Sequence, residues 1–121
     1  MDVLVGIGSP DESVAALERT ARQAAATGDS VTVAIVGDHS AATRERLETE
    51  SNAVADDVGI DVTVRHLDGE PGSQLVDVAE NEEFDELVIG GGSTSPMGKI
   101  TIGATAEFVL LNAHTTVTLV R

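Results

Sequence analysis

The chain has 121 residues, enough for one hydrophobic core, and we expect a single domain over residues 1–121. The apolar share is 41%, the aromatic share only 2%, and cysteine is absent; this predicts an aliphatic core typical of a parallel sheet and excludes disulfides, thiolate metal ligands and cysteine nucleophiles. The net charge of −14 repels phosphates and anionic lipids, so nucleic acids and membrane surfaces are poor candidate partners.

Apolar runs alternate with helical patterns in the first part of the chain. Residues 3–7 predict a short strand that ends in a Gly-Ser-Pro turn. A helix with one apolar face follows, capped by Ser9 or Asp11 and ended by Gly28. Residues 31–36 are a β-branched run and predict the second strand.

The middle of the chain predicts a polar helix and an exposed strand. Ser40 is the expected cap of this helix, and Gly59 follows its end. Residues 61–67 alternate apolar and polar side chains, which is typical of an edge strand with one partly wet face. After residues 68–72 we expect a short helix.

The last third predicts a buried strand at residues 86–89, a helix at 105–112 and a final strand at 116–120. The whole alternation of strands and helices predicts an α/β fold, a doubly wound parallel sheet with helices on both faces and right-handed crossovers. In such sheets, ligands bind beyond the carboxyl ends of the strands, where the strand order reverses.

A glycine-rich loop, residues 89–105 (IGGGSTSPMGKITIGAT), follows a buried strand and leads into a helix. Its three consecutive glycines at 90–92 let the backbone approach a ligand closely because they carry no Cβ. The helix that opens near Gly103 leaves its first amides without internal partners, which suits phosphate. Like the turn after Ile7, this loop follows the carboxyl end of a strand, so both lie where a ligand is expected.

Two known phosphate-binding motifs are excluded. Residues 92–100 read G-x5-G-K-I, close to a P-loop, but the spacing is one residue too long and Ile100 stands where a hydroxyl must hold magnesium. Gly6-x-Gly8 is a weak dinucleotide fingerprint because Asp11 occupies the third glycine position.

A phosphoacceptor domain of similar architecture is also disfavoured. It needs clustered acids after the first strand, an acceptor aspartate after the third and a lysine on the last strand. Asp11 and Glu12 fit the first requirement and Asp68 the second, but residues 116–120 contain no lysine. We therefore interpret Asp68-Gly69 as a turn.

The sequence predicts no catalytic or metal-binding residues. Its histidines are His39, His66 and His114. They lie at no metal-ligand spacing, and we interpret them as surface or packing residues. Ser9, Ser93 and Ser95 have no nearby signature of an activating base. We therefore expect that the chain is not an enzyme.

One pattern covers essentially the whole chain. VLVGIGSPDESVAALERT opens it with a strand, a Gly-Ser turn and a helix, and FDELVIG and ATAEFVLLNAHTTVTLV flank the glycine loop near its end. Within that loop, Gly90 is followed by Ser93, and nine residues later by Gly103 and Ala104. This resembles the universal stress protein family, whose members end with a strand, G-x2-G-x9-G-[ST], a helix and a short strand.

The resemblance implies a fold and a site. The fold is a five-stranded sheet of order 3-2-1-4-5, Rossmann-like or adenine nucleotide alpha hydrolase-like. The site is a crevice between the loops after strands 1 and 4 that takes ATP, with Mg²⁺, or another adenine nucleotide. The residues implied to line it are Ile7, Gly8, Val36, Ile89, Gly90, Gly92, Ser93, Gly103, Ala104 and Thr105.

Some family members bind ATP and others do not, and three positions here depart from the binding members. Gly8 replaces an aspartate that contacts the adenine and ribose end. Ser93 adds a Cβ near the phosphate, and Ala104 lacks the small hydroxyl, although Thr105 is adjacent. Two lost contacts at about 1–2 kcal/mol each lower affinity by roughly one to three orders of magnitude. We expect weak nucleotide binding or its loss.

The resemblance also implies a homodimer through the last strand, residues 116–120. The sequence permits this, because an apolar edge strand with little charge is best covered by a partner. The preferred function is that of a stress-response, regulatory or protective protein. The alternative is a ligand-free dimeric interaction module, and a more distant one is an enzyme of the related adenine-nucleotide hydrolase folds.

Charge and hydropathy also suggest where the protein works. The acidic residues are scattered and lysine occurs once, which resembles adaptation to a high-salt cytoplasm, where screening removes self-repulsion. We infer a salt-loving microbial source, haloarchaeal in kind. No secretory pattern or bilayer-length apolar run is visible, so we expect a cytoplasmic location.

Overall fold

The fold comes from a computed structural model, and the residues that it describes are 1–8, 10–90, 93–94, 100–101 and 103–120. The strands are β1 (Asp2–Ile7), β2 (Ser30–Ile35), β3 (Val62–His66), β4 (Glu86–Gly90), β5 (Ser93–Thr94), β6 (Ile100–Thr101) and β7 (Thr116–Val120). The helices are α1 (Pro10–Thr27), α2 (Ala41–Val58), α3 (Pro71–Asn81) and α4 (Ala104–Asn112).

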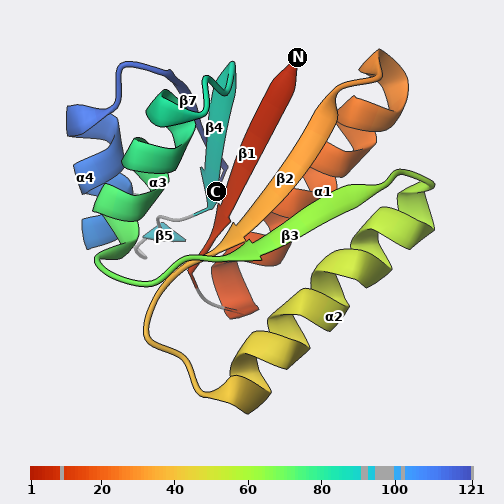
Figure 1. Ribbon diagram of the computed structural model, residues 1–121, viewed down its shortest axis with the longest axis horizontal. Helices are drawn as coiled ribbons and strands as arrows, with labels where there is room; N and C mark the ends of the chain where they lie inside the picture. Colours follow the sequence, from red (N-terminus) through yellow and green to blue (C-terminus); the bar gives the residue numbers. More distant parts are fainter. Residues whose placement is uncertain (9, 91–92, 95–99, 102, 121) are drawn as a thin grey trace.

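A five-stranded parallel sheet forms the centre of the molecule (Figure 1). Its order is β3-β2-β1-β4-β7, which confirms the expected order 3-2-1-4-5, with β7 as the fifth strand. The central strand β1 pairs with β2 on one side and with β4 on the other. The strand order therefore reverses between β1 and β4, which is where doubly wound sheets bind ligands.

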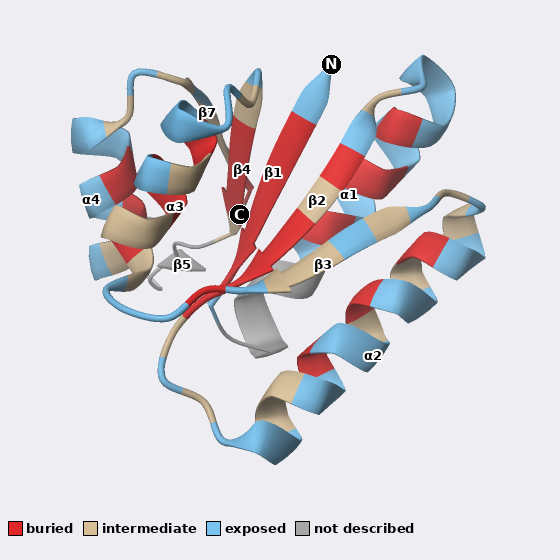
Figure 2. Ribbon diagram, in the orientation of Figure 1, coloured by how far each residue is buried: buried red, intermediate tan, exposed pale blue. Residues whose placement is uncertain are grey.

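Helices cover both faces of the sheet, as predicted. α1 and α2 pack on one face, and α3 and α4 on the other (Figure 1). Successive residues of β1 alternate between the two layers: Val3 and Val5 pack with α1, whereas Leu4 packs with α3 and α4. Buried residues concentrate in the three inner strands and on the inward sides of the helices (Figure 2).

The predicted residues set the ends of α2. The hydroxyl oxygen of Ser40 accepts a hydrogen bond from the Thr43 N–H at 3.2 Å, a cap worth about 1 kcal/mol. Gly59 has φ 84°, a left-handed conformation that glycine adopts without strain, and it ends the helix. None of the helices in the described ranges is long and apolar enough to cross a membrane.

The structure corrects the sequence interpretation at two points. α1 begins at Pro10, so Asp11 lies in its first turn and cannot be its cap. Proline is favoured at the first helical position because its missing N–H would be unpaired there in any case. The other candidate cap, Ser9, lies outside the described residues. The glycine loop also holds a short antiparallel pair, β5 with β6, that the sequence did not indicate.

Candidate functional site

The crevice begins where β1 and β4 end side by side. Gly6 pairs with Ile89, so the next residues of both strands, Ile7 and Gly90, emerge at the same edge of the sheet. Ile7 and Ile89 are almost fully buried and anchor this edge. Four of the residues implied by the family resemblance, Ile7, Gly8, Ile89 and Gly90, are therefore together at the reversal point.

Gly8 borders open space at this edge. It is exposed, and among the described residues a Cβ added to it would meet only a methyl of Val36, at 3.9 Å. Val36 continues from β2, and its N–H donates to the Ile7 carbonyl at 2.9 Å. Its side chain is only 1% exposed and belongs to the core on the α3 and α4 side. The wall expected from Val36 therefore lies within the core and offers a ligand almost no surface.

His39 is the residue at this edge that the sequence interpretation missed. Its Nε2 lies 3.1 Å from the Gly8 carbonyl oxygen and 3.0 Å from that of Val36. Carbonyl oxygens only accept, so Nε2 carries a proton and donates to both. The ring lies against Gly37, where φ is 104° and a Cβ would come within 3.0 Å of Nε2. His39 thus ties the segment after β2 to the end of β1.

The N-terminus of α4 supplies the second part of the site. Gly103 caps the helix in an extended conformation, without a side-chain hydrogen bond, and a Cβ there would meet no atom of the described residues within 4 Å. The first intrahelical bond in this turn is donated by the Glu107 N–H to the Gly103 carbonyl. The amides of Ala104 and Thr105 precede it and have no partner inside the helix, so they can donate to an anion.

Ala104 and Thr105 also line a cleft of about 360 Å³ between the starts of α3 and α4. Both helices point their N-termini toward it, which favours negative charge, while the carboxylate of Glu70 opposes it. Ser93 lies in β5, and Gly92 lies outside the described residues. Between Gly90 and Gly103, the structure describes only residues 93–94 and 100–101.

The described residues form no ready-made metal-binding cluster. No group of three or more His, Asp or Glu side chains that could hold a metal ion occurs in the described parts of the chain. The donors that the site offers are the main-chain amides at the start of α4, because the Nε2–H of His39 already donates to the Gly8 and Val36 carbonyls. These groups can bind an anionic, hydrogen-bonding ligand.

Comparison with known proteins identifies the family. The model of the Universal stress protein family matches residues 1–121. The chain belongs to this family. A universal stress protein of Methanocaldococcus jannaschii is 31% identical over 68 residues, which make up 56% of this chain and 40% of that relative. The match therefore spans less than half of that universal stress protein's length.

Solved universal stress proteins share the whole fold. One, in complex with cAMP, has a TM-score of 0.82 and 26% identity, covering 100% of this chain and 96% of that one. Another, from Archaeoglobus fulgidus in complex with dAMP, has a TM-score of 0.78 and 20% identity, covering 100% and 98%. The fold seen here is thus the family's fold over its full length.

Proposed function

We propose that this chain is a stress-response regulatory or protective protein that binds an adenine nucleotide weakly, between the loops after β1 and β4 and the start of α4. The observation that carries the proposal is the α4 N-terminus. Its first amides precede the first intrahelical bond, and no atom of the described residues would lie within 4 Å of a Cβ added to Gly103. The cAMP bound to a universal stress protein that is 26% identical supports an adenine nucleotide as the ligand class.

The phosphate end of the ligand would meet the Ala104 and Thr105 amides, and the nucleoside would lie toward Gly8. Gly8 is exposed, and Val36 is the one described residue that approaches its Cβ position, at 3.9 Å, which supports this placement. If ATP is bound, Mg²⁺ would arrive on its phosphates, because Mg²⁺ is commonly held by phosphates, waters and one or two carboxylates. The loss of side-chain contacts at Gly8 and Ala104 favours weak binding.

Calorimetry with AMP, cAMP, ADP and ATP, with and without Mg²⁺ in molar salt, tests the proposal. Gly103→Asp places a carboxylate beside the α4 amides and should weaken binding by about tenfold or more through repulsion and competition for the amides. Asn81→Asp is the matched control, because it adds the same charge at an exposed position at the end of α3, before β4 begins, whereas the site lies beyond the other end of β4. Heat of binding that is absent for all four nucleotides at millimolar concentration would refute the proposal.

A ligand-free interaction module is the second candidate, and one observation favours it. The N–H of Val36 is bonded to Ile7, and its carbonyl accepts from His39. The main-chain N–H and carbonyl of Val36 are therefore already hydrogen-bonded within the protein, which leaves them less available to an adenine base. Absence of binding in the calorimetry would select this candidate.

We also propose a homodimer through β7. β7 is an edge of the sheet, carries no charged side chain and leaves main-chain groups for a second copy to pair with. The neighbouring helix α4 exposes Leu110, at 41%, and Leu111, at 75%. Light scattering during size-exclusion chromatography should report twice the mass of the chain; a monomer at millimolar concentration would contradict the dimer.

Three further parts of the proposal follow from the sequence: a cytoplasmic location, a salt-loving source and action without catalysis. The absence of catalysis is tested by incubation with ATP and Mg²⁺. Release of ADP above the rate of a Gly103→Asp control would overturn this part and favour a hydrolase.

A further inference from the structure

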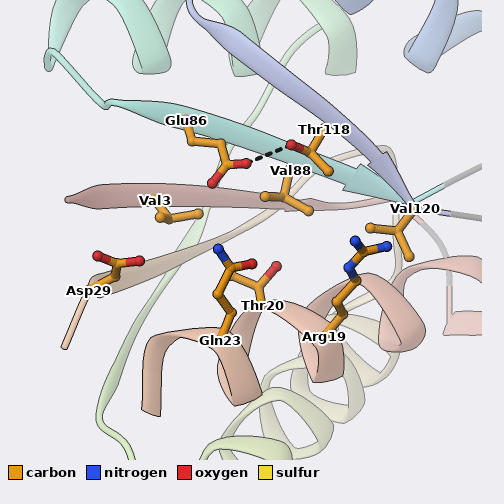
Figure 3. A pocket seen from close by; sticks show the side chains of 9 residues that line it. All are labelled: Val3, Arg19, Thr20, Gln23, Asp29, Glu86, Val88, Thr118 and Val120. Carbon is orange, nitrogen blue, oxygen red and sulfur yellow. Dashed lines mark hydrogen bonds between the residues drawn. The ribbon is translucent and has the colours of Figure 1, made fainter. Parts of the chain in front are cut away.

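A second cleft lies on the face of the sheet opposite α3 and α4 (Figure 3). It has a volume of about 250 Å³ and runs between α1 and the strands β4 and β7. It exists because α2 packs mainly over β2, β3 and α1, which leaves α1 as the main cover of β4 and β7 on this face. Side chains of Val3, Val88 and Val120 form an apolar floor.

The two ends of this cleft carry opposite charges. The guanidinium of Arg19 lies at the end near Val120, and the carboxylates of Glu86 and Asp29 lie toward the other end (Figure 3). The Thr118 hydroxyl donates to Glu86 Oε2 at 2.6 Å and holds that carboxylate in place. The cleft is thus a bipolar groove with an aliphatic middle.

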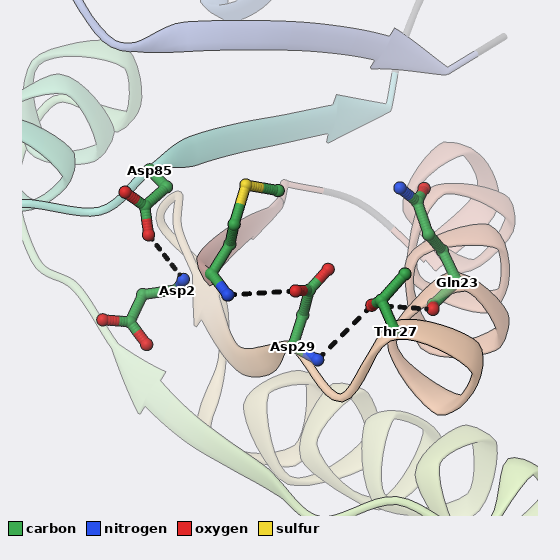
Figure 4. A network of polar contacts seen from close by, with 6 residues as sticks. Asp2, Gln23, Thr27, Asp29 and Asp85 are labelled. Carbon is green, nitrogen blue, oxygen red and sulfur yellow. Dashed lines mark hydrogen bonds and ion pairs between the residues drawn. The ribbon is translucent and has the colours of Figure 1, made fainter.

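Asp29 is itself fixed within a small network (Figure 4). Its Oδ1 accepts from the Met1 ammonium at 3.0 Å, and its N–H donates to the Thr27 hydroxyl oxygen at 3.4 Å. Hydrogen bonding of the Asp29 carboxylate with the Thr27 side chain, and then with the Met1 ammonium, holds the pKa of Asp29 below its usual value. Asp29 therefore keeps its charge, largely balanced by Met1, and Glu86 is left as the main anionic group of the groove.

Arg19 has no carboxylate partner in the parts of the chain that the structure describes. Arg44, Arg46 and Arg65 pair with carboxylates at 3.0, 3.2 and 2.8 Å, whereas Arg19 forms no ion pair within the described ranges of the chain. In a protein with 21 acidic residues, a guanidinium beside an apolar floor is thus available to a ligand. Arg22, about one turn further along α1, likewise forms no ion pair with another described residue, and it does not line the cleft.

We propose that this groove binds a linear zwitterion, with a carboxylate at one end, an ammonium at the other and methylene groups between. Arg19 would hold the carboxylate through paired N–H donors, Glu86 would accept from the ammonium, and the valine floor would cover the methylenes. A simple anion would be repelled by Glu86, and a simple cation by Arg19. The volume is below the range of drug-sized ligands, so the ligand is small.

The strand register indicates the length of the ligand. Glu86 pairs with Thr116 and Gly90 with Val120, so the two ends of the groove are four residues apart, or roughly 13 Å along β7. The long side chains of Arg19 and Glu86 shorten the gap that a ligand must bridge. An ω-amino acid with several methylenes therefore fits better than an α-amino acid, whose charged groups are adjacent.

A titration of the full chain, followed by amide NMR shifts, tests this proposal with three probes: 6-aminohexanoate, hexanoate and hexylammonium. 6-Aminohexanoate should shift the amides of Val88, Thr118 and Val120 saturably and bind about tenfold more tightly than either single-charge probe. Glycine, as the short zwitterion, should bind no better than hexanoate. Saturable shifts that are equal for hexanoate and 6-aminohexanoate would overturn the zwitterion, and no saturable shift up to about 100 mM would overturn the site.

Variants place the ligand in the groove. Arg19→Gln should weaken 6-aminohexanoate binding by about tenfold, and Glu86→Gln, which keeps an oxygen for the Thr118 hydroxyl, by a similar factor. Arg22→Gln is the matched control and should bind like the unaltered chain. Arg19 lies on an exposed helix surface, so its variant should fold, which thermal unfolding verifies. Unchanged binding in Arg19→Gln would refute the proposal.

Discussion

Two glycines on β1 and at its end, Gly6 and Gly8, lack a side chain for different reasons. A Cβ on Gly6 would lie 2.8 Å from a methyl carbon of Leu75, so packing by α3 requires glycine there. Among the described residues, a Cβ on Gly8 would meet only Val36, at 3.9 Å, so their packing does not require glycine at that position. Gly6 and Gly8 together resemble part of a dinucleotide fingerprint. In the structure, however, Gly6 makes room for Leu75, whereas Gly8 borders the crevice.

Substitution by alanine should distinguish these two roles. Gly6→Ala forces Leu75 to shift and should lower the free energy of unfolding by about 1–2 kcal/mol, as overpacked cores do. Gly8→Ala has only ordinary van der Waals contact and should change it by less than about 0.5 kcal/mol. Urea denaturation measures both values. Equal losses in the two variants would contradict the packing explanation.

The hydrogen bonds of His39 lead to a second prediction about a single residue. Because Nε2 donates to two carbonyls, the neutral ring should be the Nε2–H tautomer, which ¹⁵N chemical shifts of the imidazole report directly. His39→Ala leaves both carbonyls without this donor and should lower the free energy of unfolding by about 1 kcal/mol. An Nδ1–H tautomer would contradict the geometry. The sequence could not place this residue, because its contact with Gly8 spans 31 positions.

The Met1 and Asp29 pair predicts a pH dependence. The pKa of Asp29 lies below 3.8, so its contribution to stability is complete above pH 3.8 and is lost as the pH falls through the lowered pKa. The hydrogen bond to Asp29 raises the pKa of the Met1 ammonium above 8.0, so that contribution is complete below pH 8.0 and is lost as the pH rises through the raised pKa.

Asp29→Asn should therefore be less stable than the unaltered chain between pH 3.8 and 8.0, with a difference that shrinks on both sides. Chemical denaturation at several pH values measures this. Both groups are exposed, so the difference should be small and should decline with added salt. A difference that is constant from acid to alkaline pH would show that the pair contributes nothing.

At the scale of the elements, periodicity predicted most of the fold. The five strands of the main sheet and the four helices lie within one or two residues of their expected bounds, and Thr116–Val120 matches its prediction fully. The short pair β5 and β6 was missed because strands of two residues carry no alternating pattern. The Asp11 cap was wrong because Pro10, pre-organised for a first helical position, starts α1 one residue earlier.

The backbone conformations of the glycines at two helix ends predict how alanine substitutions there change stability. Gly59 has φ 84° at the end of α2, and Gly103 has φ −69° before α4. Gly59→Ala should therefore cost about 1 kcal/mol of stability, since alanine is strained in the left-handed region. Gly103→Ala should cost much less. Thermal unfolding of the two variants compares them; a larger loss for Gly103→Ala would contradict the assigned cap conformations.

For the whole molecule, charge is the dominant feature. A net charge of −14 on 121 residues creates self-repulsion that the described surface ion pairs, such as Arg65 with Glu82, offset only weakly. Raising KCl from about 0.1 M to about 2 M shortens the Debye length to a few Å and should raise the melting temperature. A melting temperature that falls or stays constant across this range would contradict the inferred adaptation to high salt.

The α4 amides carry the central claim, and NMR can observe them individually. In a titration with AMP in molar salt, the amides of Gly8, Gly90, Ala104 and Thr105 should shift saturably and together, with one dissociation constant in the high micromolar to millimolar range, while those of α2 stay in place. Shifts that are absent at these amides, or that appear only elsewhere on the sheet, would contradict the account.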